Sequence, residues 1–331
     1  MEDIHLSGGG GVKKFDVVAL GELLVDFTEN GVSAQGNPLL EANPGGAPCN
    51  VLSMLQNLGK ETAFIGKVGD DAFGKMLTDA IREQGIHTEN LVVDKEVHTT
   101  LAFVHTAKDG DRTFSFYRNP GADMMLRWDE VKQDMLSEAT IFHFGTLSMT
   151  DDEIANVTKK AVEKAKSEGS MISFDPNLRP PLWKDLEEAK QQMWYGIGQC
   201  DILKISDDEI AFLSGTDDID QGMEIIMQKT QAKLVCATMG KTGSKAYYNG
   251  ESVFCKPFLR TDTIETTGAG DTFMACILNA VLEKGLEKLT QDDVFEMLRF
   301  ANAASSIITT RKGALKVMPT REEIVDQFSN L

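Results

Sequence analysis

The sequence predicts an α/β fold: a three-layer sandwich with a mostly parallel central sheet between helices, and a small β-sheet lid. Three observations lead to this prediction. Short apolar runs recur along the chain, helical patterns lie between them, and two segments break the alternation. With 331 residues, 42% of them hydrophobic, the chain can form one large domain with an appendage, or two domains.

The predicted strands are apolar runs without alternation, which is typical of strands buried on both faces. The first is FDVVAL at residues 15–20, and Gly21 ends it. Similar runs follow at residues 63–65, 141–144, 171–174, 202–205 and 234–237. Between two of them, residues 152–168 repeat apolar side chains at spacings of three and four, and Gly169 ends this helix. Ligands of such sheets bind at the carboxyl ends of the strands.

Two segments read as hairpin strands rather than as strand and helix. They are residues 32–41 and residues 99–117, and the second contains an Asp109-Gly110 turn. We expect them to form a small antiparallel lid over the main sheet.

Composition excludes several partners. The net charge of −18 argues against a nucleic-acid surface or an anionic membrane surface, and no apolar run is long enough to span a bilayer. The N-terminus also lacks the basic-then-apolar order of a signal peptide, so we expect a cytoplasmic protein. The five cysteines are scattered without metal-ligand spacing, so we expect buried reduced thiols. The glycines at residues 8–11 precede the first strand and indicate a flexible tail.

Residues 266–271 (TTGAGD) are the most informative segment of the chain. Their small residues open an apolar helical run at residues 272–282. A glycine-rich helix start leaves N–H groups exposed, and the helix dipole adds positive charge, so this segment predicts a phosphate site. The carboxylate of Asp271 beside that site can act as a general base.

Two further motifs predict contacts to a hydroxylated ligand. Residues 45–50 (GGAPCN) open a helix; the glycines permit close approach of a ligand, and Asn50 offers a donor and an acceptor. The alternative is a plain turn into a helix. Asp26 follows the first strand and could accept hydroxyl hydrogen bonds, or it could be a surface loop acid.

Three segments follow buried strands, and each has a functional and a structural interpretation. In residues 175–179 (DPNLR), Arg179 could reach phosphate oxygens or be a solvated turn residue. In residues 206–209 (SDDE), Glu209 completes a capping box, while an acidic residue there could orient magnesium-bound waters. Residues 238–243 (TMGKTG) form a tight loop against a nucleotide or an ordinary loop.

Together and in this order, these motifs resemble the ribokinase-like (pfkB) carbohydrate kinase family, and within it most closely the fructokinases. The resemblance runs from about residue 15 to about residue 327. It is carried by residues 21–26, 45–50, 66–74, 114–123, 175–179 and 266–271. It implies one ribokinase-like domain at residues 15–328, with lid segments at about 32–42 and 97–118, after a tail at residues 1–14.

The resemblance also implies roles for individual residues in an ATP-dependent, magnesium-dependent sugar kinase. Asp271 would deprotonate the primary hydroxyl of the sugar, while the N–H groups of Gly268, Ala269 and Gly270 stabilise the transferred phosphoryl. The sugar would be held by Asp26, Gly45, Gly46, Asn50, Arg118 and Asn177, with Phe103 as an apolar wall. The nucleotide and its phosphates would be held by Thr238, Gly240, Gly243, Asn302, Lys204 and Arg179, with Glu209 orienting magnesium-bound water.

One departure from the family pattern concerns a monovalent cation. Glu265 stands where many relatives have an aspartate that helps to bind this cation, whereas Thr267 and Gly313 keep the usual residue types. Potassium activation therefore stays open. Lid residues Leu39, Leu40, Leu101 and Phe103 could pack on a second copy of the chain, giving a homodimer, or on the sugar.

Fructose is the favoured substrate, since residues 116–120 (FYRNP) and 122–123 (AD) resemble fructokinases. The close alternative is a 2-keto-3-deoxygluconate kinase, in which Arg118 would face the substrate carboxylate; another ribokinase-like sugar or nucleoside kinase is a further alternative. A dinucleotide-dependent oxidoreductase would need G-x-G-x-x-G after the first strand, where this chain has one glycine. A catalytically silent binding protein on the same fold is opposed by Asp271 and its glycines.

Overall fold

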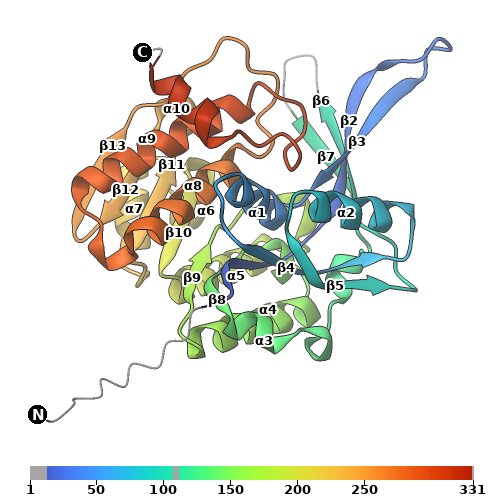
Figure 1. Ribbon diagram of the computed structural model, residues 1–331, viewed down its shortest axis with the longest axis horizontal. Coiled ribbons are helices and arrows are strands. Elements are labelled where there is room, and N and C mark those ends of the chain that lie inside the picture. Colours follow the sequence, from blue (N-terminus) through green and yellow to red (C-terminus); the bar gives the residue numbers. More distant parts are fainter. Residues whose placement is uncertain (1–12, 107–111, 330–331) are drawn as a thin grey trace, which may run out of the picture.

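The computed structural model describes residues 13–106 and 112–329, and its centre is a nine-stranded sheet (Figure 1). The strand order is β13-β12-β11-β10-β9-β8-β1-β4-β5. The strands are β1 Phe15–Leu20, β4 Thr62–Gly69, β5 His87–Asp94, β8 Ala139–Phe144, β9 Met171–Phe174, β10 Ile202–Ser206, β11 Leu234–Thr238, β12 Ser244–Tyr248 and β13 Glu251–Cys255.

The predicted parallel sheet is confirmed. All six predicted runs are strands, and neighbours from β5 to β11 pair in parallel. The sequence prediction missed β5, β12 and β13. The last two pair antiparallel through a turn at Asn249 and Gly250, both with positive φ, which is the backbone of a tight hairpin.

Helices cover both faces of the sheet (Figure 1). On one face lie α1 Ala47–Asn57, α2 Ala72–Glu83, α8 Ala269–Lys284, α9 Gln291–Ile308 and α10 Arg321–Ser329. On the other lie α3 Gln133–Ser137, α4 Asp152–Ser167, α5 Leu186–Gln199, α6 Asp207–Ser214 and α7 Ile219–Met227. The predicted helix at 152–168 is α4: the Asp151 side chain caps its start, and Gly169 with φ 80° follows its end.

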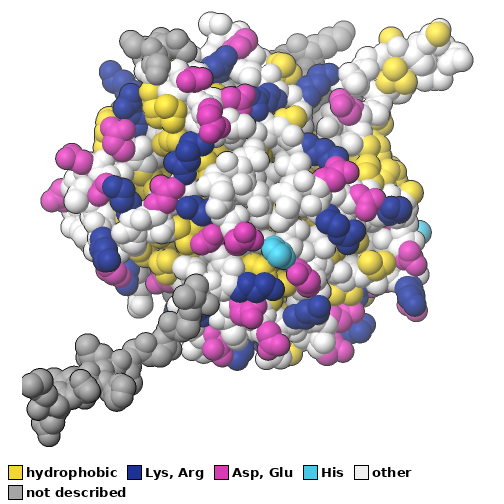
Figure 2. Space-filling model, viewed as in Figure 1, with side chains coloured by type: hydrophobic (Ala, Val, Ile, Leu, Met, Phe, Trp, Pro, Cys, Tyr) yellow, Lys and Arg dark blue, Asp and Glu magenta, His cyan; other side chains and the backbone are white. Residues whose placement is uncertain are grey.

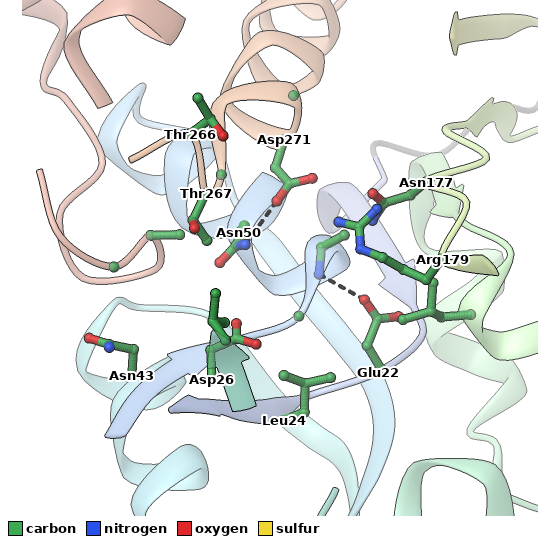
Figure 3. Close-up of a pocket in the computed structure, with 18 of the residues that line it drawn as sticks. Glu22, Leu24, Asp26, Asn43, Asn50, Asn177, Arg179, Thr266, Thr267 and Asp271 are labelled. Atoms are coloured by element: carbon green, nitrogen blue, oxygen red, sulfur yellow. Dashed lines mark hydrogen bonds between the residues drawn. The ribbon is translucent and has the colours of Figure 1, made fainter. Parts of the chain in front are cut away.

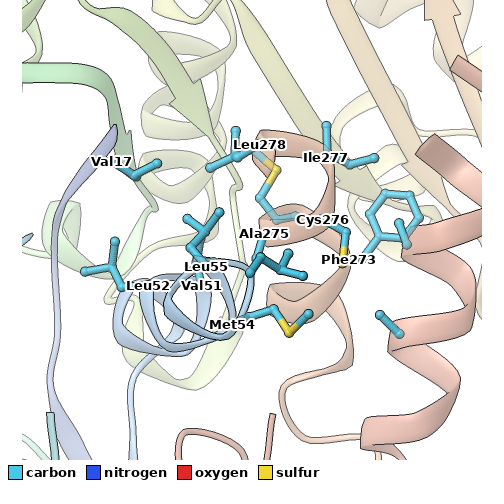
Figure 4. Packing of buried hydrophobic residues seen from close by; sticks show 14 of the residues in the cluster. Val17, Val51, Leu52, Met54, Leu55, Phe273, Ala275, Cys276, Ile277 and Leu278 are labelled. Carbon is cyan, nitrogen blue, oxygen red and sulfur yellow. The ribbon is translucent and has the colours of Figure 1, made fainter. Parts of the chain in front are cut away.

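The two hydrophobic cores lie on opposite faces of the sheet because side chains alternate along each strand. In β1, Val17 and Ala19 belong to one core, and Val18 and Leu20 to the other. Figure 4 shows α1 and α8 side by side over the first core. This packing fixes the first turns of α1 and α8 relative to each other.

The lid is a separate four-stranded sheet in the order β3-β2-β6-β7. Its strands are β2 Leu24–Val32, β3 Pro38–Gly45, β6 Leu101–Thr106 and β7 Arg112–Tyr117. The predicted strand segment at 32–41 is wrong in its bounds, because the hairpin begins at Leu24 and residues 33–37 form its turn. The lid is also not fully antiparallel, since β2 pairs with β6 in parallel.

Two predictions fall outside the described residues: the glycine tail at 8–11 and the Asp109-Gly110 turn. Within residues 13–106 and 112–329, no helix has the length and apolar character needed to cross a membrane. Acidic and basic side chains are interspersed over the face in Figure 2. The five cysteines are free and buried, as predicted.

We expect a glycine in α5 to be required by the core. A Cβ at Gly196 would lie 2.3 Å from the Phe174 ring, whereas one at Gly198 would have nothing within 4 Å. Gly196→Ala should therefore lower the free energy of unfolding by about 1–3 kcal/mol. Gly198→Ala, the matched control, should raise it by up to about 0.5–1 kcal/mol. Urea unfolding measures both, and equal effects of the two substitutions would contradict the packing.

Candidate active site

Two cavities meet at the first turn of α8. The first, of about 730 Å³, lies under the lid, and we call it the lid cavity. The second, of about 410 Å³, lies between the loops after β11 and β13, and we call it the loop cavity. Thr266 and Gly270 line both. A group bound at the turn can therefore be reached from either side.

The turn between the cavities depends on glycine. Gly268 has φ 77° and caps α8, and a Cβ there would lie 2.7 Å from the Cβ of Ala314. A Cβ at Gly270 would lie 3.0 Å from the Lys204 Nζ, so the absence of a side chain lets that ammonium approach the turn. The helix begins at Ala269, earlier than the predicted 272.

The turn offers fewer amide donors than the resemblance implies. The Ala269 N–H already donates to the Thr266 carbonyl at 3.2 Å. Within the described residues, no hydrogen bond from the N–H of Gly268 or Gly270 is formed. These two amides, the helix dipole and the nearby Lys204 ammonium make the turn an anion-binding site.

Asp271 lies in the first turn of α8 and is 9% exposed. Its Oδ2 accepts a hydrogen bond from the Asn50 Nδ2 at 2.8 Å (Figure 3). Burial raises the pKa of Asp271, against the Asn50 hydrogen bond and the charges of Lys204 and Arg179. A carboxylate with a raised pKa is a stronger base than an exposed one, as proton abstraction from an alcohol requires.

Asn50 reaches Asp271 because two glycines precede α1. Gly46 has φ 120°, and a Cβ there would lie 2.4 Å from the Glu22 carbonyl oxygen. A Cβ at Gly45 would lie 2.2 Å from the Asp26 Oδ2. The Asn50 Oδ1 is buried without a hydrogen-bond partner in the described structure. That acceptor is available to a ligand hydroxyl.

Asp26 is on β2 and points into the lid cavity from the lid side (Figure 3). Burial raises its pKa to about 7; Arg179 opposes this rise, and Asp271 and Glu265 add to it. The carboxylates of Asp26 and Asp271 thus face one cavity from opposite sides.

Phe103 does not form the predicted wall. In the lid register Phe103 pairs with Phe27, and their rings stack at 4.9 Å on the face away from Asp26. Successive side chains of a strand point to opposite faces, so Asp26 shares its face with Val104 and Phe116 instead. These two side chains form the apolar wall.

Arg118 also does not line the lid cavity. Its guanidinium is buried and pairs with the Asp123 carboxylate at 2.7 Å, and it donates to the Thr150 hydroxyl and the Leu147 carbonyl. These bonds occupy it in a structural role. The substrate-facing position implied by the resemblance is therefore not adopted.

Arg179 and Asn177 line the lid cavity on the side opposite the 266–267 loop (Figure 3). Arg179 was predicted near phosphates, and the structure places it among the carboxylates, where its charge opposes the rise in the pKa of Asp26 and of Asp271. Asn177 has φ 48°, which turns the chain sharply after β9.

The loop cavity gathers the predicted nucleotide residues Thr238, Gly240, Gly243, Lys204 and Asn302. Lys204 is buried and pairs with the Asp175 carboxylate at 3.0 Å. Burial alone would lower its pKa, but the Asp175 and Glu209 carboxylates raise it, so the ammonium stays charged. Asn302 donates to the carbonyls of Cys255 and Lys256, which holds this wall in place.

The predicted metal residues have structural partners. One Glu209 oxygen accepts the Ser206 N–H of the capping box, and the other accepts the Leu178 N–H. Glu265 accepts the Gly313 N–H at 2.8 Å, and both line the lid cavity with Thr267. In the part of the chain that is described, no group of three or more His, Cys, Asp or Glu side chains could hold a metal ion.

Sequence reasoning missed several residues of the lid cavity. They are Glu22, Asn43, Val104, Asp208 and Phe116. For Asn43, the signal was its place on the second strand of the lid hairpin. This strand pairs with the strand of Asp26, and the register places Asn43 opposite Asp26. For Glu22, it was a carboxylate immediately after Gly21 at the end of a buried strand.

Two cavities that meet at a glycine turn, with a buried carboxylate beside it, are the arrangement expected of a small-molecule kinase. The chain belongs to the pfkB family of carbohydrate kinases, whose model matches residues 14–321.

Known relatives cover nearly the whole chain. It is 39% identical to probable fructokinase-4 of Arabidopsis thaliana over 93% of this chain and 95% of that protein. It is 38% identical to fructokinase-1 of Zea mays over 93% of this chain and 96% of that protein.

Solved structures have the same fold. The fructokinase of Xylella fastidiosa with bound ATP has a TM-score of 0.86 at 30% identity, covering 95% of this chain and 98% of that one. A fructokinase double mutant of Vibrio cholerae with fructose, ADP and potassium ion has a TM-score of 0.85 at 26% identity, covering 95% and 98%.

The Asn50 hydrogen bond should set the pH at which Asp271 ionises. Asn50→Ala removes a donor that lowers the Asp271 pKa, so the pKa should rise. Because the base must be ionised, the acid limb of kcat should move to higher pH. Asn57→Ala, in the same helix but bonded to the Met318 carbonyl, should leave the limb unchanged. If the acid limb of kcat in Asn50→Ala lies at the same pH as in the wild type, the Asn50 hydrogen bond does not set the pKa of Asp271.

Proposed function

We propose that this protein is an ATP-dependent fructokinase that converts fructose to fructose 6-phosphate. The observation that carries the proposal is the turn at Gly268 and Gly270 between the two cavities, with Asp271 beside it. The names of the relatives support fructose, and the ATP-bound Xylella fastidiosa structure supports the nucleotide.

In the proposed reaction, the sugar occupies the lid cavity and the nucleotide the loop cavity. Asp271 takes the proton of the primary hydroxyl, and the oxygen attacks the terminal phosphorus of ATP while the bond to the bridging oxygen of ADP breaks. The amides of Gly268 and Gly270 and the Lys204 ammonium stabilise the charge on the transferred phosphoryl. Asn50 and Asp26 accept hydroxyl hydrogen bonds and orient the sugar.

The charge of the lid cavity favours a neutral sugar over 2-keto-3-deoxygluconate. The carboxylates of Glu22, Asp26 and Asp271 line it, and a substrate carboxylate would be repelled by them. Arg118, the expected partner of such a carboxylate, is occupied by Asp123. Arg179 would favour the acid sugar, but it balances Asp26 and Asp271.

Magnesium enters the proposal with the nucleotide. Since both oxygens of Glu209 accept backbone N–H groups, the ion would be held mainly by phosphates and water, its usual ligands in kinases. Bound there, magnesium neutralises phosphate charge. A potassium ion would need the oxygens of Glu265, Thr267 and the backbone near Gly313, and these three residues line one wall.

We also propose a cytoplasmic homodimer joined through the outer face of the lid. The five free cysteines fit a reducing compartment. Phe103, Leu101 and Leu40 lie on the face away from the sugar by their register, and Leu40 is 44% exposed. Hydrophobic side chains gather where the lid hairpin joins the body in Figure 2. Apolar surface of this kind is typical of an interface.

A sugar panel tests the function. With magnesium and ATP, coupled ADP release should be fastest with fructose, and kcat/KM should exceed that for 2-keto-3-deoxygluconate. The control variant Asp271→Asn should bind fructose and ATP in calorimetry but lose at least about 10²-fold in kcat. If no fructose-dependent turnover is found, the fructokinase assignment is wrong. If Asp271→Asn keeps a near-normal kcat, Asp271 is not the general base.

Light scattering tests the dimer. The wild type should have twice the 36.3 kDa mass of one chain. Leu40→Lys should dissociate it, because the substitution buries an unpaired charge. Val93→Lys, which changes an equally exposed valine on the edge strand β5, should leave it dimeric. A wild-type mass of one chain would refute the dimer.

A further inference from the structure

Glu22 is a buried carboxylate of the lid cavity that the sugar site above does not use. It follows β1 by two residues and is 3% exposed. Figure 3 shows Glu22 on the same side of the cavity as Asp26 and Leu24, across from Asp271. Glu22 follows β1 of the main sheet, whereas Asp26 lies on the lid strand β2. The position of Glu22 is therefore set by the main sheet and not by the lid.

The backbone of α1 holds this carboxylate in place. The Glu22 Oε1 accepts the N–H of Ala47, the first residue of α1, at 2.8 Å. The two segments approach so closely that a side chain at Gly46 would overlap the Glu22 carbonyl. The helix turn that carries Asn50 therefore also orients Glu22, so both side chains present fixed polar atoms to one ligand.

The surroundings of Glu22 disfavour its charged form. Burial raises its pKa to about 7, although its own backbone N–H and that of Ala47 oppose the rise. Asp123 adds to it, and Arg118 opposes it. A buried carboxylate with few donors is costly, and a ligand hydroxyl lowers that cost. A hydroxylated ligand is therefore better matched to this wall than an apolar or anionic one.

We propose that Glu22 is a sugar-binding, specificity-determining residue: its second carboxylate oxygen accepts a hydrogen bond from a hydroxyl of the sugar while Oε1 accepts the Ala47 N–H. The inference rests on the proposed fructokinase function. It adds a contact from the main sheet to those from the lid and from α1. Glu22 and Asp26 then recognise different hydroxyls of one sugar.

Deoxy sugars test this contact. The substitution Glu22→Gln keeps an oxygen that can accept the Ala47 N–H but removes the charge facing the sugar. We expect kcat/KM for fructose to fall roughly 10- to 100-fold, the usual scale for a hydrogen bond to a charged group. Among fructose analogues lacking the hydroxyl at carbon 1, 3 or 4, one should be used equally well by wild type and variant, because the bonded hydroxyl is absent.

Controls separate this contact from folding and from the proposed function. Glu61→Gln changes a carboxylate that is 68% exposed and should match the wild type with every sugar. ADP affinity should be unchanged in Glu22→Gln if the variant is folded. If Glu22→Gln lowers kcat/KM equally for all analogues, or does not lower it for fructose, the sugar-binding role of Glu22 is wrong. The proposed fructokinase function is not affected by either result. A wild type that phosphorylates no fructose overturns the fructokinase proposal, and the inference with it.

Discussion

The hydrogen bond between Asn50 and Asp271 joins the first turns of two helices, and the rest of the site depends on it. The helices α1 and α8 pack side by side on one face of the sheet (Figure 4). Their first turns therefore meet at the carboxyl edge of the strands, where ligands of such sheets bind. One contact thus couples the proposed general base to the helix that carries Asn50, the proposed sugar ligand.

Charge in this site is balanced by the buried Lys204 and the half-buried Arg179. Asp271, Asp26 and Glu22 face one cavity, and burial raises the pKa of each. Arg179 and Lys204 oppose that rise at Asp271. Lys204 also lies against Gly270, on the side of the loop cavity. The Lys204 ammonium can therefore stabilise the ionised Asp271 carboxylate before the reaction and the charge of the phosphoryl group during transfer.

The sequence predicted well what local pattern determines. The apolar runs identified the inner strands, and residues 266–271 identified the glycine turn that begins α8 and carries Asp271. The turn at Asn249 and Gly250 was a readable hairpin signal that the prediction did not use. It would have identified β12 and β13.

What the sequence could not provide was register and partner choice. Phe103 and Phe116 are both lid aromatics, and only the pairing of β2 with β6 and of β6 with β7 decides which one faces Asp26. Arg118 resembles a substrate ligand in its motif, yet Asp123, five residues later, pairs with it in the fold. The Ala269 amide was a predicted phosphoryl donor, and its bond to Thr266 depends on the turn geometry.

The most direct measurement is a crystal structure with ADP, fructose, magnesium and aluminium fluoride, which imitates the transferred phosphoryl. The account predicts that the fluoride lies against the amides of Gly268 and Gly270, with the primary hydroxyl of fructose within hydrogen-bond distance of Asp271. A fluoride bound away from this turn, or a sugar whose primary hydroxyl points away from Asp271, would contradict it.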